Sequence, residues 1–159
     1  MEVIDNFLKP NEFNKVKEIL FHPNFEWYYE DHMVSTDHCF FNHCFYSHNK
    51  VRTDYFNDVE FILEKLNCVS LVSLRNNLVI GKKESYESEW HTDYNYKNCK
   101  TAILYFNDCN AKTLLKTPER TESVDTKANR VVIFPTTTKH KMVSQTDTKR
   151  RVIMNINYF

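Results

Sequence analysis

The chain has 159 residues, of which 42% are hydrophobic and 14% aromatic, a size and composition that suit one domain with a proper core. Its 21 basic and 21 acidic residues cancel to a formal net charge of zero, so no overall field attracts nucleic acid or anionic lipid. The single glycine, Gly81, excludes the glycine-rich loops that cradle nucleotide phosphates. We therefore expect one domain over residues 1–159 without nucleotide-dependent chemistry.

The sequence also carries signals about its compartment. Residues 1–5 lack the basic start and apolar run of a signal peptide, and no apolar segment approaches the length of a membrane span. The five cysteines are an odd number without regular spacing, as in proteins with reduced thiols. Cys39, His43 and Cys44 could form a zinc site, but no second Cys/His pair has ligand-like spacing, so ordinary thiols are the better interpretation. These features predict a cytoplasmic protein without a membrane contact.

The first part of the chain predicts helices. Residues 3–8 are an apolar segment that suits an edge strand, and Pro10 then fits the first turn of a helix over residues 10–21. The aromatic-rich region 25–46 is compatible with short strands or an ordered loop, and with either a core or a substrate-facing role. Apolar residues recur at helical spacing again over residues 53–66, which predicts a second helix.

From residue 69 onward, short segments rich in β-branched and aromatic residues alternate with polar turns. This pattern is typical of a β-sandwich or barrel. We expect a mainly β fold, with helical support over residues 1–68 and a jelly-roll core over residues 69–159. The predicted strands cover residues 69–80, 101–106, 121–124, 130–134, 141–144 and 151–158.

The first candidate for chemistry is His91-Thr92-Asp93. Of the seven histidines, only His91 has a carboxylate two residues later, and positions i and i+2 of an extended chain point to the same face. By itself this pair is better explained as a hydrogen-bonded contact at a strand end. In a jelly roll, however, strands distant in sequence meet, so His140 can join it. Two histidines and one carboxylate form the facial triad that favours non-haem Fe(II).

The final predicted strand supports a cavity beside this triad. Arg151 begins a face that continues with Ile153, Asn155 and Asn157, whereas the opposite face is apolar. Because His140 precedes this strand by one hairpin, we expect the polar face to line the cavity. Arg151 is then a candidate for bidentate capture of a carboxylate near the metal, and Arg150 is expected on the surface.

These motifs, in this order, resemble the 2-oxoglutarate- and Fe(II)-dependent dioxygenases, specifically the small prolyl 4-hydroxylase-like branch with short viral and bacterial members. The resemblance extends over nearly the whole chain, and the ordered set of motifs with its spacing is what carries it. The matching residues are 3–8, 91–93, 101–107, 129–134, His140 and 151–159.

The resemblance implies that His91, Asp93 and His140 bind Fe(II). It also implies that Arg151 pairs with the distal carboxylate of 2-oxoglutarate and that Tyr105 donates a hydrogen bond to the same carboxylate. The fold implied is a double-stranded β-helix (jelly roll, cupin-like). The reaction implied is hydroxylation of a C–H bond, in a prolyl or other protein residue or in a small molecule, with O2 consumed, succinate and CO2 released and ascorbate in support.

Two departures from the family's pattern leave the substrate open. Residues 108–114 lack the Gly-Gly pair that many relatives carry, and Val79, with Arg75 and Asn77 nearby, stands where relatives often have a tyrosine. Three alternatives also remain: a non-catalytic jelly-roll binding module, a zinc-dependent hydrolase, and a nucleic-acid or small-molecule oxygenase of the same superfamily. The complete triad and Arg151 argue against the binding module. No obvious general base accompanies the triad and Arg151 would have no role in a zinc hydrolase, which argues against the second alternative, and the neutral charge argues against nucleic acid.

Overall fold

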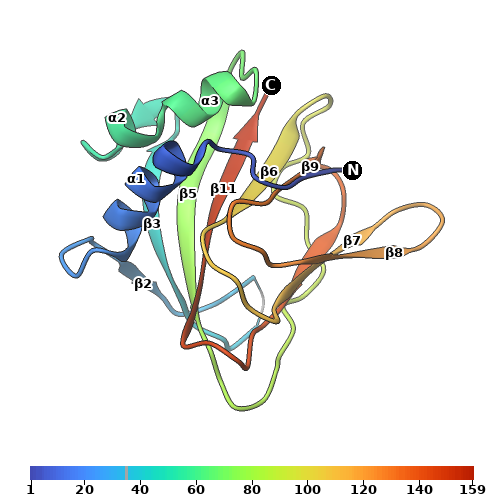
Figure 1. The fold of residues 1–159 in the computed structure, drawn as a ribbon. Coiled ribbons are helices and arrows are strands. Elements are labelled where there is room, and N and C mark those ends of the chain that lie inside the picture. The colour runs from blue at the N-terminus through green and yellow to red at the C-terminus, as the bar shows by residue number, and fades with distance from the viewer. Residues whose placement is uncertain (35) are drawn as a thin grey trace.

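A computed structural model of the chain describes residues 1–34 and 36–159 (Figure 1). It consists of short helices near the N-terminus and antiparallel strands throughout. The elements are β1 (Glu2–Ile4), α1 (Pro10–Phe21), β2 (Tyr28–Glu30), β3 (Phe40–Ser47), β4 (Lys50–Val51), α2 (Phe56–Val59), α3 (Phe61–Lys65), β5 (Leu71–Ile80), β6 (Lys100–Tyr105), β7 (Lys112–Lys116), β8 (Thr121–Asp125), β9 (Val131–Pro135), β10 (His140–Val143) and β11 (Arg150–Tyr158).

The strands form two antiparallel sheets. The large sheet has the order β1-β9-β6-β11-β5-β3-β2, with β4 paired to β3, and the small sheet has the order β10-β7-β8. Neighbouring strands in the large sheet are mostly distant in sequence. For example, β11 pairs with β5 on one side and with β6 on the other. This arrangement confirms the predicted mainly β jelly roll, and it brings the loop after β5 next to the start of β10.

Helix α1 covers one face of the large sheet, and the small sheet lies on the other side (Figure 1). The helix begins at Pro10, as predicted, and the Glu12 carboxylate accepts a hydrogen bond of 2.9 Å from the backbone N–H of Lys9. Its buried stripe packs in the same core as the apolar face of β11, which includes Val152 and Met154. The alternation predicted for the last strand is therefore confirmed: one face packs on the helices and the other faces the small sheet.

Several boundaries differ from the sequence prediction. The second predicted helix is divided into α2 and α3, and the chain leaves α3 through Asn67 at a positive φ of 52°. Residues 1–68 also contribute β1 to β4, so the division into helical support and β core is less sharp than expected. In the aromatic-rich region, β3 places Phe45 in the core and Phe40 beside a cavity, so both roles left open for that region occur. Strand β7 was not predicted, because its short sequence carries exposed lysines at both ends.

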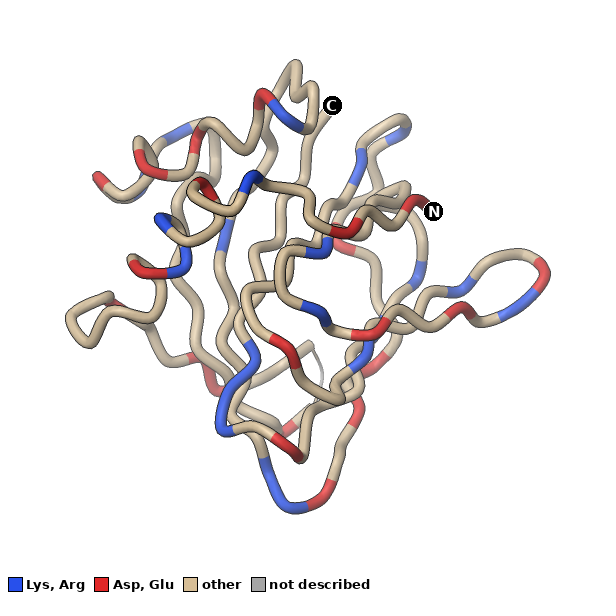
Figure 2. Tube along the Cα trace, in the orientation of Figure 1, with Lys and Arg blue, Asp and Glu red and all other residues tan. Residues whose placement is uncertain are grey.

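Basic and acidic residues are interspersed along the chain (Figure 2). Among the described residues, no helix combines the length and the apolar character that crossing a bilayer requires. All five cysteines are unbonded thiols. Because the overall charge is balanced, a charged ligand has to be recognised by a local group of side chains.

Candidate metal centre

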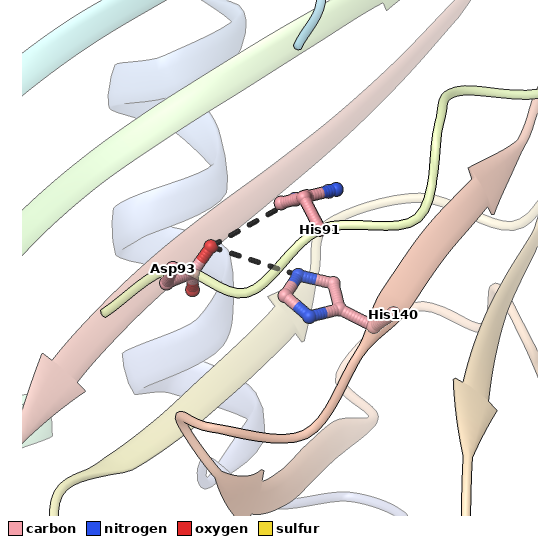
Figure 3. Close-up of side chains that lie close together, drawn as sticks. All are labelled: His91, Asp93 and His140. Carbon is pink, nitrogen blue, oxygen red and sulfur yellow. Dashed lines mark ion pairs between the residues drawn. The ribbon is translucent and has the colours of Figure 1, made fainter. Parts of the chain in front are cut away.

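His91, Asp93 and His140 meet at one end of the space between the two sheets (Figure 3). His91 and Asp93 lie in the loop between β5 and β6, and His140 is the first residue of β10. Two backbone hydrogen bonds join the histidines, from His91 N to His140 O at 3.0 Å and from His140 N to His91 O at 2.8 Å. One ligand atom from each of the three side chains lies within 4.8 Å of the others. The structure thus brings together the three residues that the sequence analysis selected.

Hydrogen bonds orient both imidazole rings. Nδ1 of His91 lies 3.0 Å from the carbonyl oxygen of Glu89, and Nδ1 of His140 lies 3.2 Å from that of Thr138. Each Nδ1 therefore carries the proton and donates it, which leaves Nε2 with a free lone pair. The two Nε2 atoms lie 3.9 Å and 3.6 Å from Oδ1 of Asp93. Burial lowers the pKa of His140, against the opposing effect of Asp93, and favours the neutral ring that a metal requires.

The carboxylate of Asp93 is held through its other oxygen. Oδ2 accepts a hydrogen bond of 3.1 Å from Nδ2 of Asn155, and the Thr101 hydroxyl lies 3.2 Å away. Thr101 is itself within 2.7 Å of Oδ1 of Asn157, and Asn157 donates 2.8 Å to Oδ1 of Asn155. This buried polar cluster fixes the carboxylate and leaves Oδ1 directed at the two histidines.

The donor set fits a divalent transition metal. Two neutral imidazole nitrogens and one carboxylate oxygen converge from one side, and the other side opens into a cavity, so exchangeable ligands can bind there. Among the described residues, this is the one group of histidine, cysteine and acidic side chains with such geometry. Cys39, His43 and Cys44 do not form such a group, so the structure does not assemble the alternative zinc site.

The cavity beside the triad has a volume of about 450 Å³, a size typical of small-molecule sites. The triad and the polar faces of β5 and β11 border it on one side. Met33, Phe40 and Met142 contribute an apolar wall. A cavity of this kind can shield a bound metal and an organic ligand from water.

Arg151 points into the same cavity from β11. Its side chain is only 2% exposed, yet no carboxylate of the described residues forms an ion pair with it. Nε donates 3.1 Å to the hydroxyl of Thr126, Nη2 donates 3.0 Å to that of Thr113, and the guanidinium carbon lies 5.4 Å from the ring centre of Tyr105. Burial lowers the pKa of Arg151 because the cation has left water. A buried cation without an anion is costly, so this position is suited to an anionic ligand.

Tyr105 and Thr113 complete this end of the cavity. The Tyr105 hydroxyl is fully buried and donates 2.8 Å to the Thr113 hydroxyl, and Tyr105 does not itself border the cavity. Burial raises the pKa of Tyr105, so the phenol keeps its proton. Thr113 accepts bonds from both Tyr105 and Arg151, which leaves its own proton free for an acceptor in the cavity. The sequence analysis missed Thr113, because it lies on the unpredicted strand β7.

Arg150 has the opposite orientation. It is exposed, and its guanidinium carbon lies 4.3 Å from the ring centre of Phe21 in α1. The alternation of β11 therefore gives the two consecutive arginines different environments, one on the surface and one inside.

Three solved structures show what the fold resembles. A 2-oxoglutarate–Fe(II) oxygenase family oxidoreductase from Burkholderia pseudomallei has a TM-score of 0.74 at 6% identity, over 98% of this chain and 84% of its own. A Pseudomonas putida prolyl-4-hydroxylase has a TM-score of 0.72 at 10% identity, over 99% and 90%. A Trichoplax adhaerens prolyl hydroxylase, solved with a hypoxia inducible factor peptide fragment, has a TM-score of 0.69 at 12% identity, over 99% and 82%.

These likenesses define the class of fold: the chain has the jelly roll of the 2-oxoglutarate–Fe(II) oxygenases. A comparison with protein-family models finds no match, and neither does a comparison with curated protein sequences. The fold is therefore established by structure, and the chemistry is inferred from the residues of the site.

Proposed function

We propose that the protein is an Fe(II)- and 2-oxoglutarate-dependent dioxygenase that hydroxylates a C–H bond. The observation that carries this proposal is the buried, unpaired Arg151 on the wall of the cavity into which the His91, Asp93 and His140 group opens. A metal triad alone would also suit a hydrolase. The added cation supports a co-substrate that binds a metal at one end and carries a carboxylate at the other, as 2-oxoglutarate does.

Each residue has a distinct role in this proposal. His91 and His140 hold the iron through Nε2, and Asp93 holds it through Oδ1. Arg151 and the Thr113 hydroxyl bind the distal carboxylate of 2-oxoglutarate. Tyr105 is a positioning residue, since it orients Thr113 and packs against the Arg151 guanidinium. When bound, iron and 2-oxoglutarate supply the oxidation in which O2 gives one oxygen atom to succinate and one to the substrate, with loss of CO2.

Other residues maintain the conditions for this chemistry. Asn155 and Thr101 keep the Asp93 carboxylate in one orientation, which limits the ways in which a metal can bind. The apolar wall with Met33, Phe40 and Met142 reduces water beside the reacting groups. We propose a peptide or small-molecule substrate and ascorbate as a supporting reductant, in line with the peptide-bound prolyl hydroxylase among the structural neighbours.

Two measurements test the proposed function. Anaerobic addition of Fe(II) and 2-oxoglutarate should produce a weak visible charge-transfer absorption, and admission of O2 with ascorbate should release succinate slowly without a prime substrate. Asp93→Ala, which removes the carboxylate ligand, should lose both signals. The Lys15→Ala variant is the control, because this exposed side chain on α1 pairs only with Asp58, far from the site. Absence of both signals in the wild-type protein, or tight binding of zinc in place of iron, would contradict the proposal.

A further inference from the structure

The polar floor of the cavity extends beyond the triad onto β5. Arg75, Asn77 and Val79 alternate on the face of this strand that borders the cavity. They lie directly across from Asn155, Ile153 and Arg151 of β11, respectively. Arg151 itself turns the other way, toward Tyr105 of β6 and Thr113 of β7. Along the paired strands, Arg75 therefore lies at the Asn155 end, next to the residue that binds Asp93, and is four residues away from the position opposite Arg151.

Arg75 is a second arginine in this cavity and has no role in the proposed binding of iron or 2-oxoglutarate. Arg75 is exposed at the border of the cavity, and the described residues supply neither an ion-pair partner nor a side-chain hydrogen bond for its guanidinium. Its cross-strand neighbour Asn155 is engaged elsewhere, since Nδ2 donates to Asp93 and Oδ1 accepts from Asn157. All five N–H donors of Arg75 are therefore available to a ligand.

Asn77 lies two residues further along the same face, about 7 Å away by strand geometry. Its Oδ1 atom is buried and has no hydrogen-bond partner among the described residues. The amide of the cross-strand neighbour Asn42 is directed to Glu30 instead. A buried acceptor without a donor costs free energy, so this oxygen is suited to an N–H or O–H group of a ligand.

The charge of the cavity points in the same direction. Arg75, Lys141 and Arg151 border it with Asp93 as the one carboxylate, and Glu87 pairs with Lys141 from outside the lining. A bound divalent metal and the 2-oxoglutarate dianion would neutralise each other. The loaded cavity would therefore keep a positive charge at the β5 end, where Arg75 stands beside the metal ligand network.

We propose that the prime substrate carries a free carboxylate next to an amide N–H, as in an N-acyl amino acid or the C-terminal residue of a peptide. Its carboxylate binds Arg75, its N–H donates to Oδ1 of Asn77, and its side chain lies along Met33 and Phe40 toward the metal. This inference rests on the proposed function, and it makes Arg75 and Asn77 the residues that determine specificity.

Binding beside the metal can be measured without turnover. The protein is loaded with Mn(II) and saturated with 2-oxoglutarate, which occupies Arg151, and paramagnetic broadening of the proton resonances of added probes is then recorded. The probes are N-acetyl amino acids as free acids and as amides, with short peptides that have free or amidated C-termini as the second arm. Free acids should be broadened at concentrations about 10- to 100-fold lower than their amides, and Arg75→Gln should remove this preference.

Further variants separate specific recognition from a general effect of charge. N-methylation of the probe amide should weaken binding to the wild-type protein about 2- to 10-fold and should have less effect on Asn77→Leu. Arg120→Gln, which changes an exposed arginine on the β7–β8 hairpin, should retain the full preference for acids. If only the N-acetyl amino acids show the preference for the free acid, the substrate is an N-acyl amino acid. If only the peptides show it, the substrate is the C-terminal residue of a peptide. Either result supports the proposal.

Equal broadening by acids and amides, no broadening by any probe, or a preference that survives in Arg75→Gln would overturn the inference. Thermal unfolding of Arg75→Gln and Asn77→Leu shows whether each variant is folded, and Arg75→Lys gives a conservative second variant that should keep part of the preference. The proposed function fails separately, if Fe(II) and 2-oxoglutarate give no absorption in the wild-type protein. In that case the Mn(II) experiment without 2-oxoglutarate still reports on Arg75.

Discussion

Replacement of Arg151 by methionine should weaken 2-oxoglutarate binding strongly and change the stability of the fold little. The guanidinium is 2% exposed, is held by two threonine hydroxyls and faces no carboxylate of the described residues. Loss of one member of a buried, hydrogen-bonded charge pair costs about 2–5 kcal/mol. Arg151→Met should therefore raise the Kd of 2-oxoglutarate by about 30- to 5,000-fold.

The ligand-free protein should respond much less. Exchange of buried charges for an apolar side chain of similar length is often stabilising by about 1–4 kcal/mol, and the lost bonds to Thr113 and Thr126 offset about 1 kcal/mol each. We expect the free energy of unfolding of metal-free Arg151→Met to lie between about 1 kcal/mol below and about 2 kcal/mol above that of the wild type.

Two measurements on the same variants check these expectations: an anaerobic absorption titration of the Fe(II) protein with 2-oxoglutarate, and urea unfolding of the metal-free protein. Arg150→Met is the matched control, because Arg150 is exposed and packs on Phe21. It should change the Kd little and the unfolding free energy within about 0.5 kcal/mol. A Kd for Arg151→Met within threefold of wild type would refute the assignment, as would an equal effect of Arg150→Met.

Three further predictions concern a residue that orients Asp93, a buried histidine outside the site and the single glycine. Asn155→Leu removes one of the two contacts that hold Oδ2 of Asp93 and should lower metal affinity about 10- to 100-fold in competition with a chromogenic chelator; unchanged affinity would argue against its orienting role. Burial lowers the pKa of His43 from its usual 6.5. As the pH falls below 6.5, the unfolded chain binds a proton before the folded protein does. The free energy of unfolding therefore decreases as the pH falls from 6.5 to the folded-state pKa. His43→Phe should therefore lose less unfolding free energy between about pH 7 and pH 5 in urea titrations, and equal losses would contradict this. Gly81→Ala places a Cβ 2.1 Å from the carbonyl oxygen of Thr148. This overlap should lower the free energy of unfolding by about 1–3 kcal/mol, measured by thermal unfolding. An unchanged Tm would show that the loop relieves the overlap by moving without an energetic cost.

Local signals in the sequence were sufficient for much of the architecture. Helix α1 was predicted over residues 10–21 because Pro10 and the apolar stripe that includes Phe13 and Leu20 are short-range features. The two faces of β11 could be assigned because strand alternation is local as well, and it separated Arg151 from Arg150. Signals that depend on partner strands were weaker, as the missed strand β7 and the division of the second helix show.

The metal triad was predictable for a related reason. The pair His91 and Asp93 follows from spacing alone, whereas His140 was added through the expectation that a jelly roll brings distant strands together. The backbone bonds between His91 and His140 now give that expectation a geometric basis. Tyr105 illustrates the limit, because its position was found from sequence but its hydroxyl is directed to Thr113, on a strand that no local pattern indicated.

Residue identity and spacing were enough to predict the composition of the site: two histidines and a carboxylate at a recognisable spacing, and an arginine on the inward face of the last strand. How these groups act together depends on the fold. It placed Thr113 beside Arg151, and among the described residues it left Arg151 and Arg75 without an acidic partner and Oδ1 of Asn77 without a donor. The physical reason is that chemical identity is encoded residue by residue, whereas the presence or absence of a partner depends on strands that are distant in the chain and adjacent in the sheets.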